Sequence, residues 1–329
     1  MQNILVTGGA GYIGSHVAYD LIDKGFNVTI LDNLSSGSTK IIPEKAKFIK
    51  TDIGNLNLIS KILKKDKFDA IIHLAAYTSV EESVNYPKRY MINNYEKTKK
   101  LINLCIKNKV KNVVFSSTAA VYGNNGNNKK IKEEVKTKPT NPYGKSKLLV
   151  EKYLSKIKNK NFNYCILRYF NVAGADSKLR CGEIHRKHNH LIKQISETMV
   201  NKRKTMIIYG NNYPTRDGTG VRDYIHVSDI SDIHVKATKY LLNRKSKKSL
   251  TLNCGYGSGF SVLEIIKQAQ RIKRFKYIFG YRRQGDVPYL VADINRLKYK
   301  LKWKPKFNNM KKIFQSAFKW ETKISSRQE

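Results

Sequence analysis

The segment 141–147 carries a tyrosine and a lysine, Tyr143 and Lys147, four residues apart. On a helix, side chains at positions i and i+4 project from the same face, one turn apart. A nearby ammonium group favours phenolate over phenol, so this pair is expected to act as a base near neutral pH. Lys145 is also close in sequence, but its spacing places it on another face of the helix. Beside a dinucleotide, such a base suits hydride transfer from a secondary alcohol.

A glycine-rich turn near the start of the chain predicts where that dinucleotide binds. Gly8, Gly11 and Gly14 follow the apolar segment Ile4–Thr7 with the spacing G-x-x-G-x-x-G. The first glycine permits a tight turn, the second lets backbone approach a pyrophosphate, and the third allows close packing of a helix whose N-terminus favours phosphate. The alternative for such a pattern is an ordinary strand–helix turn. The tyrosine–lysine pair in the same chain favours the nucleotide site.

Two aspartates follow the next predicted strands. Asp32 closes the second strand, at about the distance where a carboxylate binds the adenine ribose hydroxyls. Because a carboxylate there repels a 2′-phosphate, it favours NAD over NADP. Asp52 follows the third strand and is a candidate for the adenine edge. A helix N-cap carboxylate is an equally good interpretation of Asp52.

A hydroxyl just beyond the predicted strand Asn112–Ser116 completes the candidate site. Ligands of open parallel sheets bind beyond the carboxyl ends of the strands. Thr118 lies there and is expected to hydrogen-bond the reacting oxygen and to share a proton with Tyr143. The alternative is a strand-end hydroxyl that satisfies nearby backbone groups.

Short apolar strands alternate with helical stretches in the first half of the chain, which is typical of a parallel sheet covered by helices on both faces. The predicted strands are Ile4–Thr7, Asn27–Leu31, Lys47–Lys50, Ala70–Leu74, Asn112–Ser116 and Asn163–Arg168. Helices are expected to begin near Tyr12, Asn55, Pro87 and Pro142. The sequence therefore predicts an α/β fold with a Rossmann-like, doubly wound parallel sheet.

After about residue 171 the pattern loosens, with helices expected near 191–201, from residue 228, and at 261–271. We interpret this part as a smaller C-terminal α/β domain that binds the substrate. The predicted division is residues 1–170 for the nucleotide-binding domain and 171–329 mainly for the substrate domain. A segment near 222–250 is a candidate to return to the large sheet. The tail after Trp320 is expected to fray.

Composition excludes several classes of protein. The chain has 329 residues, of which 40% are hydrophobic and 10% aromatic, so it is not a disordered chain. It has no apolar run close to the roughly 18 residues of a membrane span. An apolar strand begins almost at the first residue, so we expect no secretory leader. We therefore expect a cytoplasmic location. Cys105, Cys165, Cys181 and Cys254 form no C-x-x-C pair, which argues for reduced thiols rather than a zinc or redox site.

The net charge is +38, from 63 basic and 25 acidic residues. Such a charge attracts polyanions. Lysines lie along nearly the whole chain rather than in one tail, which favours a solvated basic surface over a dedicated nucleic-acid site.

Taken together, these motifs resemble the extended short-chain dehydrogenase/reductase superfamily and, within it, the UDP-glucose 4-epimerase family. The segments that carry the resemblance are Val6–His16, Leu31–Leu34, Phe115–Thr118, Pro142–Lys147, Leu167–Asn171 and Asp217–Val227, the last being fairly specific for the epimerases. The resemblance implies a tightly held NAD that is reduced and reoxidised within each turnover. Tyr143 would remove the proton of the sugar 4-hydroxyl while hydride leaves C4, and both would return to the other face of the 4-keto sugar. UDP-glucose and UDP-galactose would then interconvert without net redox change.

Carried across position by position, the resemblance implies three overlapping sets of site residues. The catalytic residues are Tyr143, Lys147 and Thr118. The cofactor-binding residues are Gly8, Gly11, Tyr12, Ile13, Gly14, Asp32, Asn33, Asp52, Ile53, Leu74, Ala75, Ala76, Asn93, Ser116, Tyr143, Lys147 and Tyr169. The substrate-binding residues are Thr118, Tyr143, Asn171, His190, Leu191, Tyr209, Arg222, Arg283, Asp286 and Leu290.

Within the substrate set, the resemblance implies that Arg222 and Arg283 clamp the diphosphate, for which guanidinium forks are suited. Asp286 would bind the uridine ribose, and Tyr209 would stack on the uracil. Leu290 occupies a position where strictly UDP-hexose enzymes can carry tyrosine. The smaller side chain leads us to expect some activity on UDP-N-acetylglucosamine and UDP-N-acetylgalactosamine.

Other positions bear on the alternatives. Many family members carry a cofactor-binding lysine where this chain has Thr78. Dehydratases of the superfamily place an Asp-Glu pair where this chain has Ala119 and Ala120, which argues for epimerisation over a 4,6-dehydratase or a decarboxylase. A non-catalytic protein that binds RNA or a partner is the remaining alternative, disfavoured because all three catalytic residues are present.

Two further expectations concern metals and partners. The histidines at 185, 188 and 190 have no familiar metal-site spacing, so no metal is expected. The family commonly dimerises through paired helices, which correspond to Tyr90–Lys107 and Tyr143–Lys156. We therefore expect a homodimer that binds a UDP-sugar, without a membrane or nucleic-acid partner.

Overall fold

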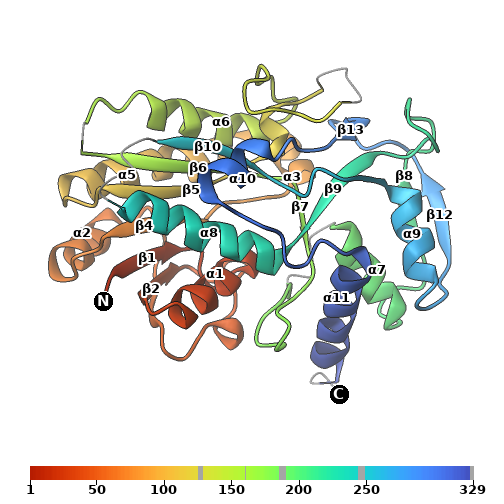
Figure 1. Ribbon diagram of the computed structural model, residues 1–329, viewed down its shortest axis with the longest axis horizontal. Helices are drawn as coiled ribbons and strands as arrows, with labels where there is room; N and C mark the ends of the chain where they lie inside the picture. Colours follow the sequence, from red (N-terminus) through yellow and green to blue (C-terminus); the bar gives the residue numbers. More distant parts are fainter. Residues whose placement is uncertain (125–128, 160, 185–189, 244–248, 327–329) are drawn as a thin grey trace.

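A parallel sheet of seven strands forms the larger part of the molecule (Figure 1). The computed structural model describes residues 1–124, 129–159, 161–184, 190–243 and 249–326. In spatial order the strands are β10 (Leu250–Cys254), β6 (Asn163–Tyr169), β5 (Asn112–Thr118), β4 (Ala70–His73), β1 (Asn3–Thr7), β2 (Asn27–Asp32) and β3 (Lys47–Lys50), and all neighbours are parallel. The six strands predicted from the sequence are present, each within two residues of its predicted bounds. The predicted doubly wound fold is confirmed.

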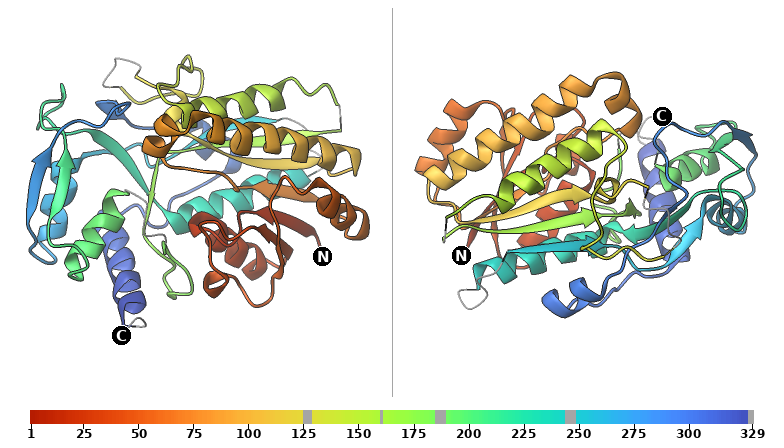
Figure 2. Two further views of the ribbon diagram at one scale, coloured as in Figure 1. Left: turned by 180° about the vertical axis from the view of Figure 1, so that it is seen from behind. Right: turned by 90° about the horizontal axis from the view of Figure 1, so that it is seen from above.

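Each face of this sheet has its own hydrophobic core, because successive side chains of a strand point to opposite faces. On β1, Ile4 and Val6 belong to one core and Leu5 to the other. The first core lies under the adjacent helices α1 (Tyr12–Asp23) and α8 (Val227–Leu242), and the second under α2 (Leu56–Lys65), α5 (Lys97–Lys107) and α6 (Pro142–Ser155). Figure 2 shows helices on both faces of the large sheet. In the described ranges, no helix is long and apolar enough to cross a membrane.

The helix predicted from Pro87 is present but interrupted. After α3 (Val80–Asn85), the four-residue helix α4 (Pro87–Tyr90) passes into a π-helical turn, Met91–Glu96, and then into α5. Wider turns of this kind often occur at functional sites. Here the turn buries Asn93 and Asn94 near the carboxyl end of β4. A smooth helix pattern in the sequence gives no sign of it.

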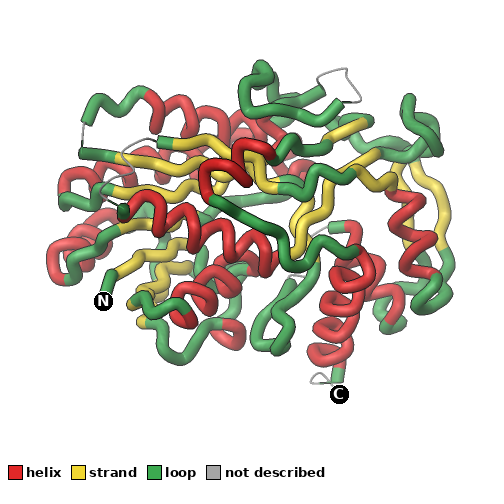
Figure 3. The backbone as a smooth tube through the Cα atoms, viewed as in Figure 1, coloured by secondary structure: helices red, strands yellow, loops and turns green. Residues whose placement is uncertain are grey.

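The smaller part of the molecule consists of short strands, helices and long loops (Figure 3). One small sheet contains β11 (Gly259–Ser261), β9 (Val221–His226), β13 (Tyr289–Leu290) and β7 (Asn171–Ala173), and a second pairs β12 (Tyr277–Gly280) with β8 (Met206–Tyr209). The helices of this part are α7 (Leu191–Met199), α9 (Val262–Gln270) and α11 (Met310–Ser325), while α10 (Asn295–Leu301) packs against β10 and α8. The three-residue 3-10 turns η1 (Thr39–Ile41) and η3 (Ala119–Val121) belong to the larger part, after β2 and β5 respectively.

The chain crosses between the two parts more than once. After β9, helix α8 packs on the large sheet and β10 joins it beside β6, before β11 pairs again with β9. The division of the chain at residues 170 and 171 stays a prediction.

The prediction that the chain frays after Trp320 is wrong for the described residues. Helix α11 continues to Ser325. Trp320 and Glu321 are buried because this end of α11 packs against α7. The prediction is wrong because a glutamate such as Glu321 is expected at the surface unless its buried partner, here Lys193, is known.

Candidate active site

A cavity of about 390 Å³ opens where the carboxyl ends of the central strands meet the smaller part of the molecule. Among the predicted site residues, those that line it are Gly8, Gly11, Tyr12, Ile13, Gly14, Asp32, Asn33, Asp52, Ile53, Leu74, Ala75, Ala76, Asn93, Ser116, Thr118, Tyr143, Lys147, Tyr169, Asn171, His190, Leu191, Arg222, Asp286 and Leu290. Two predicted residues, Tyr209 and Arg283, do not line it. The structure therefore gathers the three predicted sets, with two exceptions, into one continuous space.

The glycine turn at one end of the cavity depends on close packing. Gly8 has a φ of +72°, and a Cβ on it would lie 2.6 Å from the backbone nitrogen of Ala75. A Cβ on Gly14 would lie 2.1 Å from the carbonyl oxygen of Gly8. Helix α1 begins after Gly11 without a capping side chain. Its first-turn N–H groups therefore need another acceptor, and a diphosphate in the cavity is suited to be one.

The carboxylate of Asp32 is fixed by two backbone groups at the end of β2. It accepts hydrogen bonds from the N–H groups of Ala10, at 3.0 Å, and Leu34, at 2.8 Å. Burial raises the pKa of Asp32, and these two bonds oppose the rise. The side chain lines the cavity beside the glycine turn, where a ribose with free hydroxyls could be bound.

Asp52 lines the same end of the cavity but does not cap α2. It accepts hydrogen bonds from Gly54 N at 2.7 Å and Asn33 Nδ2 at 3.0 Å, and pairs with Lys97 at 2.7 Å. Burial raises the pKa of Asp52, but these contacts, led by Lys97, lower it overall. The cap of α2 is Asn55. The N-cap interpretation of Asp52 is therefore wrong, and the contact with adenine stays a prediction.

Helix α6 carries Tyr143 and Lys147 into the middle of the cavity. Asn141 caps it by accepting a hydrogen bond from Gly144 N at 2.8 Å, and Pro142 is in its first turn. The ammonium of Lys147 is buried and donates to the carbonyl oxygen of Ser116 at 2.8 Å. The cap thus sets the start of the helix, and the helix then fixes both side chains against the end of β5.

Burial dominates the acid–base properties of this pair. It raises the pKa of Tyr143 to about 12, although the hydroxyl of Thr118 acts in the opposite direction. It also lowers the pKa of Lys147 to about 7, which the carboxylate of Glu151 opposes. Burial therefore outweighs the hydroxyl of Thr118 in setting the pKa of Tyr143, and the expectation that the Tyr143–Lys147 pair acts as a base near neutral pH stays a prediction. In a low-dielectric site both charged forms are disfavoured, and a phenolate here needs additional positive charge.

A buried ion pair that sequence reasoning missed joins α6 to β6. Glu151 pairs with Arg168 at 2.6 Å, with 5% and 8% of their side chains exposed. The hydroxyl of Ser117, one residue before Thr118, also donates to Glu151. Glu151 is one turn beyond Lys147 among buried apolar residues of α6, and this acidic residue on an apolar face was the available signal.

At the other end of the cavity, Arg222 on β9, Asp286 and Leu290 face the same space. Outside it, the guanidinium carbon of Arg283 lies 3.7 Å from the centroid of the Tyr209 ring. The ring that the resemblance assigns to the uracil is thus covered on one face by the guanidinium that it assigns to the diphosphate.

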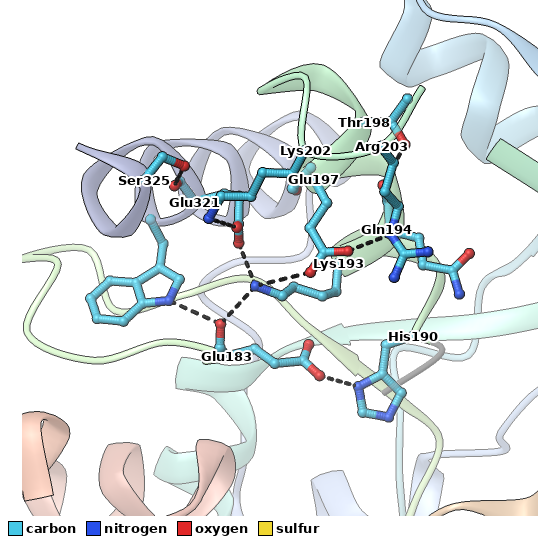
Figure 4. Close-up of polar contacts among 12 residues, drawn as sticks. Glu183, His190, Lys193, Gln194, Glu197, Thr198, Lys202, Arg203, Glu321 and Ser325 are labelled. Carbon is cyan, nitrogen blue, oxygen red and sulfur yellow. Dashed lines mark hydrogen bonds and ion pairs between the residues drawn. The ribbon is translucent and has the colours of Figure 1, made fainter. Parts of the chain in front are cut away.

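Glu183, which precedes α7 in the chain, is a cavity-lining residue that was not predicted. Glu183 lies at the cavity, and its carboxylate contacts His190 Nδ1 at 2.7 Å (Figure 4). His185 and His188 lie outside the described residues. Among the residues that are described, no three potential ligands gather as a metal site. Thr78 also lines the cavity, in the position noted for the missing lysine.

The fold and cavity are those of a dinucleotide-binding α/β enzyme, and comparison with known proteins defines the family. The sequence model of the NAD dependent epimerase/dehydratase family matches residues 4–255. The UDP-glucose 4-epimerase of Azospirillum brasilense is 41% identical over 324 residues, which are 98% of this chain and 92% of that protein. The chain belongs to the NAD dependent epimerase/dehydratase family.

Two solved structures have the same fold over nearly the whole chain. UDP-glucose 4-epimerase from Stenotrophomonas maltophila, with bound NAD and formylated UDP-arabinopyranose, has a TM-score of 0.94 and 33% identity, covering 99% of this chain and 100% of that one. The UDP-Glc/GlcNAc 4-epimerase of Campylobacter jejuni has a TM-score of 0.83 and 39% identity, covering 98% and 100%. The predicted family resemblance is confirmed.

Proposed function

We propose that this chain is a UDP-glucose 4-epimerase, which interconverts UDP-glucose and UDP-galactose by inverting C4 of the sugar. One observation carries the proposal: a single cavity brings Tyr143, Lys147 and Thr118 between the glycine turn and Arg222. Its full-length similarity to UDP-glucose 4-epimerases supports it.

The cofactor is NAD, and the residues present fit it. The uncapped N-terminus of α1 would supply N–H groups to the diphosphate, and Asp32, fixed at the end of β2, would accept from the ribose hydroxyls. Asp32 also disfavours a 2′-phosphate, as expected for NAD rather than NADP. When bound, oxidised NAD supplies a hydride acceptor and a positive ring charge that favours a nearby phenolate.

The residues of the chain then handle the proton. Tyr143 takes the proton of the sugar 4-hydroxyl during oxidation at C4 and returns it to the same oxygen during reduction. Thr118 has a single hydroxyl proton, which it donates to Tyr143 in this structure, lowering the pKa of Tyr143; with substrate bound, the same hydroxyl would hydrogen-bond the sugar oxygen. Lys147 donates to the carbonyl of Ser116, and its protonated ammonium stabilises the phenolate of Tyr143.

A 4,6-dehydratase or decarboxylase would share the first oxidation. Elimination of water needs a further acid and base, and Ala119 and Ala120 line the cavity at the positions where dehydratases carry them. A methyl group neither gives nor takes a proton, which supports epimerisation. The same intact catalytic residues disfavour a purely RNA- or partner-binding protein.

The experiment is conversion of UDP-galactose by the purified protein without added NAD, with specific detection of UDP-glucose. Formation of UDP-glucose with the mass of the substrate is the expected result, and it requires retained NAD. A product that has lost water would contradict epimerisation and favour a dehydratase.

A homodimer is part of the proposal. Helices α5 and α6 lie next to each other on one face of the large sheet, and two such pairs could form a four-helix bundle between copies. A light-scattering mass of one chain at micromolar concentration would contradict this.

A cytoplasmic location is also proposed. Cys105, Cys165, Cys181 and Cys254 are all free thiols and buried, as suits a reducing compartment. Cell fractionation tests it, and recovery of the protein from an oxidising compartment would contradict it.

A further inference from the structure

The C-terminal helix places a buried carboxylate beside α7. In Figure 4 the side chain of Glu321 on α11 points toward Lys193 on α7. Only 1% of the Glu321 side chain and 5% of the Lys193 side chain are exposed. Burying two charges is costly, and well-packed apolar residues commonly stabilise such a site as well or better. A fully buried pair therefore calls for a reason other than stability.

The geometry around Lys193 Nζ supplies that reason. The ammonium pairs with Glu321 Oε2, lies 3.6 Å from Glu197 Oε1, and donates to the backbone carbonyl of Glu183 at 3.1 Å. The indole N–H of Trp320, the residue before Glu321, donates to the same carbonyl at 3.1 Å. Two donors from two helices thus converge on one backbone oxygen, and the Lys193–Glu321 ion pair joins the helices to each other.

Glu183, whose backbone carbonyl accepts both of these hydrogen bonds, faces the cavity. The side chain of Glu183 lines it and contacts His190, which also lines it and is the N-cap residue of α7. Lys193 is three residues farther along. Helix α7 therefore carries Lys193, one partner of the buried ion pair, about one turn from its cavity-lining N-cap residue His190. A shift of α7 relative to α11 would displace His190 and Leu191 and would disrupt the two hydrogen bonds that hold the carbonyl of Glu183 from both helices.

We propose that Lys193 and Glu321 are positioning residues of the UDP-sugar site: their buried ion pair, assisted by Trp320, fixes the cavity wall formed by Glu183, His190 and Leu191. The inference rests on the proposed function for the identity of the ligand. It assigns to the C-terminal helix a role in substrate binding, although α11 contributes no residue to the lining of the main cavity.

The test compares Lys193→Met with the matched control Lys202→Met in the NAD-containing protein. Lys202 pairs with the other oxygen of Glu321 at 2.8 Å but is 31% exposed, whereas Lys193 is 5% exposed and also donates to the carbonyl of Glu183. For Lys193→Met we expect the KM for UDP-galactose to rise about tenfold or more and kcat to change less than about twofold. The reason is that the lost contacts would weaken binding of the substrate and of the transition state equally. Lys202→Met is expected to keep both values near those of the natural protein.

Calorimetric binding of UDP separates this inference from the proposed function, because it does not need turnover. Weaker UDP binding in Lys193→Met supports the positioning role even if UDP-galactose is not converted. Unchanged UDP affinity, or a fall in kcat with an unchanged KM, would overturn it.

The double variant Lys193→Met/Glu321→Met covers the case in which a lone buried charge prevents folding. Its apolar pair removes both charges together. A folded double variant with weakened UDP binding supports the role of the ion pair. A folded double variant that binds UDP as the natural protein does would show that packing alone positions the wall.

Discussion

Arg283 lies across the ring of Tyr209, with its guanidinium carbon 3.7 Å from the ring centroid. Arg282 and Tyr213 form a second pair of the same kind, at 4.2 Å. Only the first pair corresponds to positions that the family resemblance assigns to the nucleotide. For Arg283 to contact a diphosphate, its guanidinium has to leave the ring, which would free that face for a base.

Replacing Arg283 by alanine is therefore expected to weaken substrate binding. Loss of a charge-assisted contact to phosphate corresponds to about 1.5–3 kcal/mol, or roughly a 10- to 100-fold rise in KM for UDP-galactose. Steady-state kinetics measures this, with Arg282→Ala as the matched control that keeps KM within about twofold. Equal effects of the two variants would contradict the assignment.

Lys147 predicts a specific dependence of stability on pH. Its pKa is about 7 in the folded protein and 10.5 ordinarily, so between these values the unfolded chain binds a proton at this site that the folded chain does not. Stability measured without added nucleotide should therefore rise with pH from about 7 to about 10, with a contribution from Lys147 of up to about 1.4 kcal/mol per pH unit.

Urea unfolding at several pH values measures that slope. Lys147→Met should reduce it in this window, whereas Lys145→Met, which replaces an exposed lysine of the same helix, should not. A slope that is identical in the natural protein and Lys147→Met would contradict the lowered pKa.

The Glu151–Arg168 pair predicts a large loss of stability when one partner is made neutral. Glu151→Gln leaves the buried guanidinium without a counter-charge, which typically costs about 3–5 kcal/mol in the free energy of unfolding. The comparison is Glu264→Gln, because Glu264 pairs with Arg216 at the surface, where such pairs contribute about 1 kcal/mol or less. Denaturant unfolding that gives similar values for both variants would show that burial of the first pair is unimportant.

Leu290 predicts the range of sugars. It lines the cavity, at the position where the family resemblance implies that strictly UDP-hexose enzymes can carry the bulkier tyrosine. We expect turnover of UDP-N-acetylgalactosamine, and Leu290→Tyr is expected to abolish it while conversion of UDP-galactose remains. No turnover of the acetylated sugar by the natural protein, alongside good turnover of UDP-galactose, would exclude this role.

Sequence patterns predicted the nucleotide half of the molecule well because its signals are local. Six of the seven strands of the large sheet are short runs that the pattern predicts, β10 being the one not predicted, and Asn141 with Pro142 marks the start of α6. Gly8, Gly11 and Gly14 mark the turn into α1 through their spacing alone. Each of these signals lies within a few residues of the structure that it specifies.

The features that were missed depend on partners far away in sequence. Glu151 stands out as an acid on an apolar face of α6, but its partner Arg168 lies on another element, and Lys193 meets Glu321 across 128 residues, so the sequence does not show which charges pair. The high pKa of Tyr143 likewise depends on how completely the surrounding chain excludes water. The contact between Arg283 and Tyr209 arises because β8 and β12 pair side by side.

The measurement that tests the account most directly is conversion of UDP-galactose to UDP-glucose by the natural protein and by Tyr143→Phe, with the NAD content of both determined. We predict conversion by the natural protein and a loss of at least about 100-fold in kcat for the variant, since general acid–base catalysis contributes that much or more. NAD content should be similar in the two proteins. No product from the natural protein even after NAD is added, or full activity in Tyr143→Phe, would contradict the account.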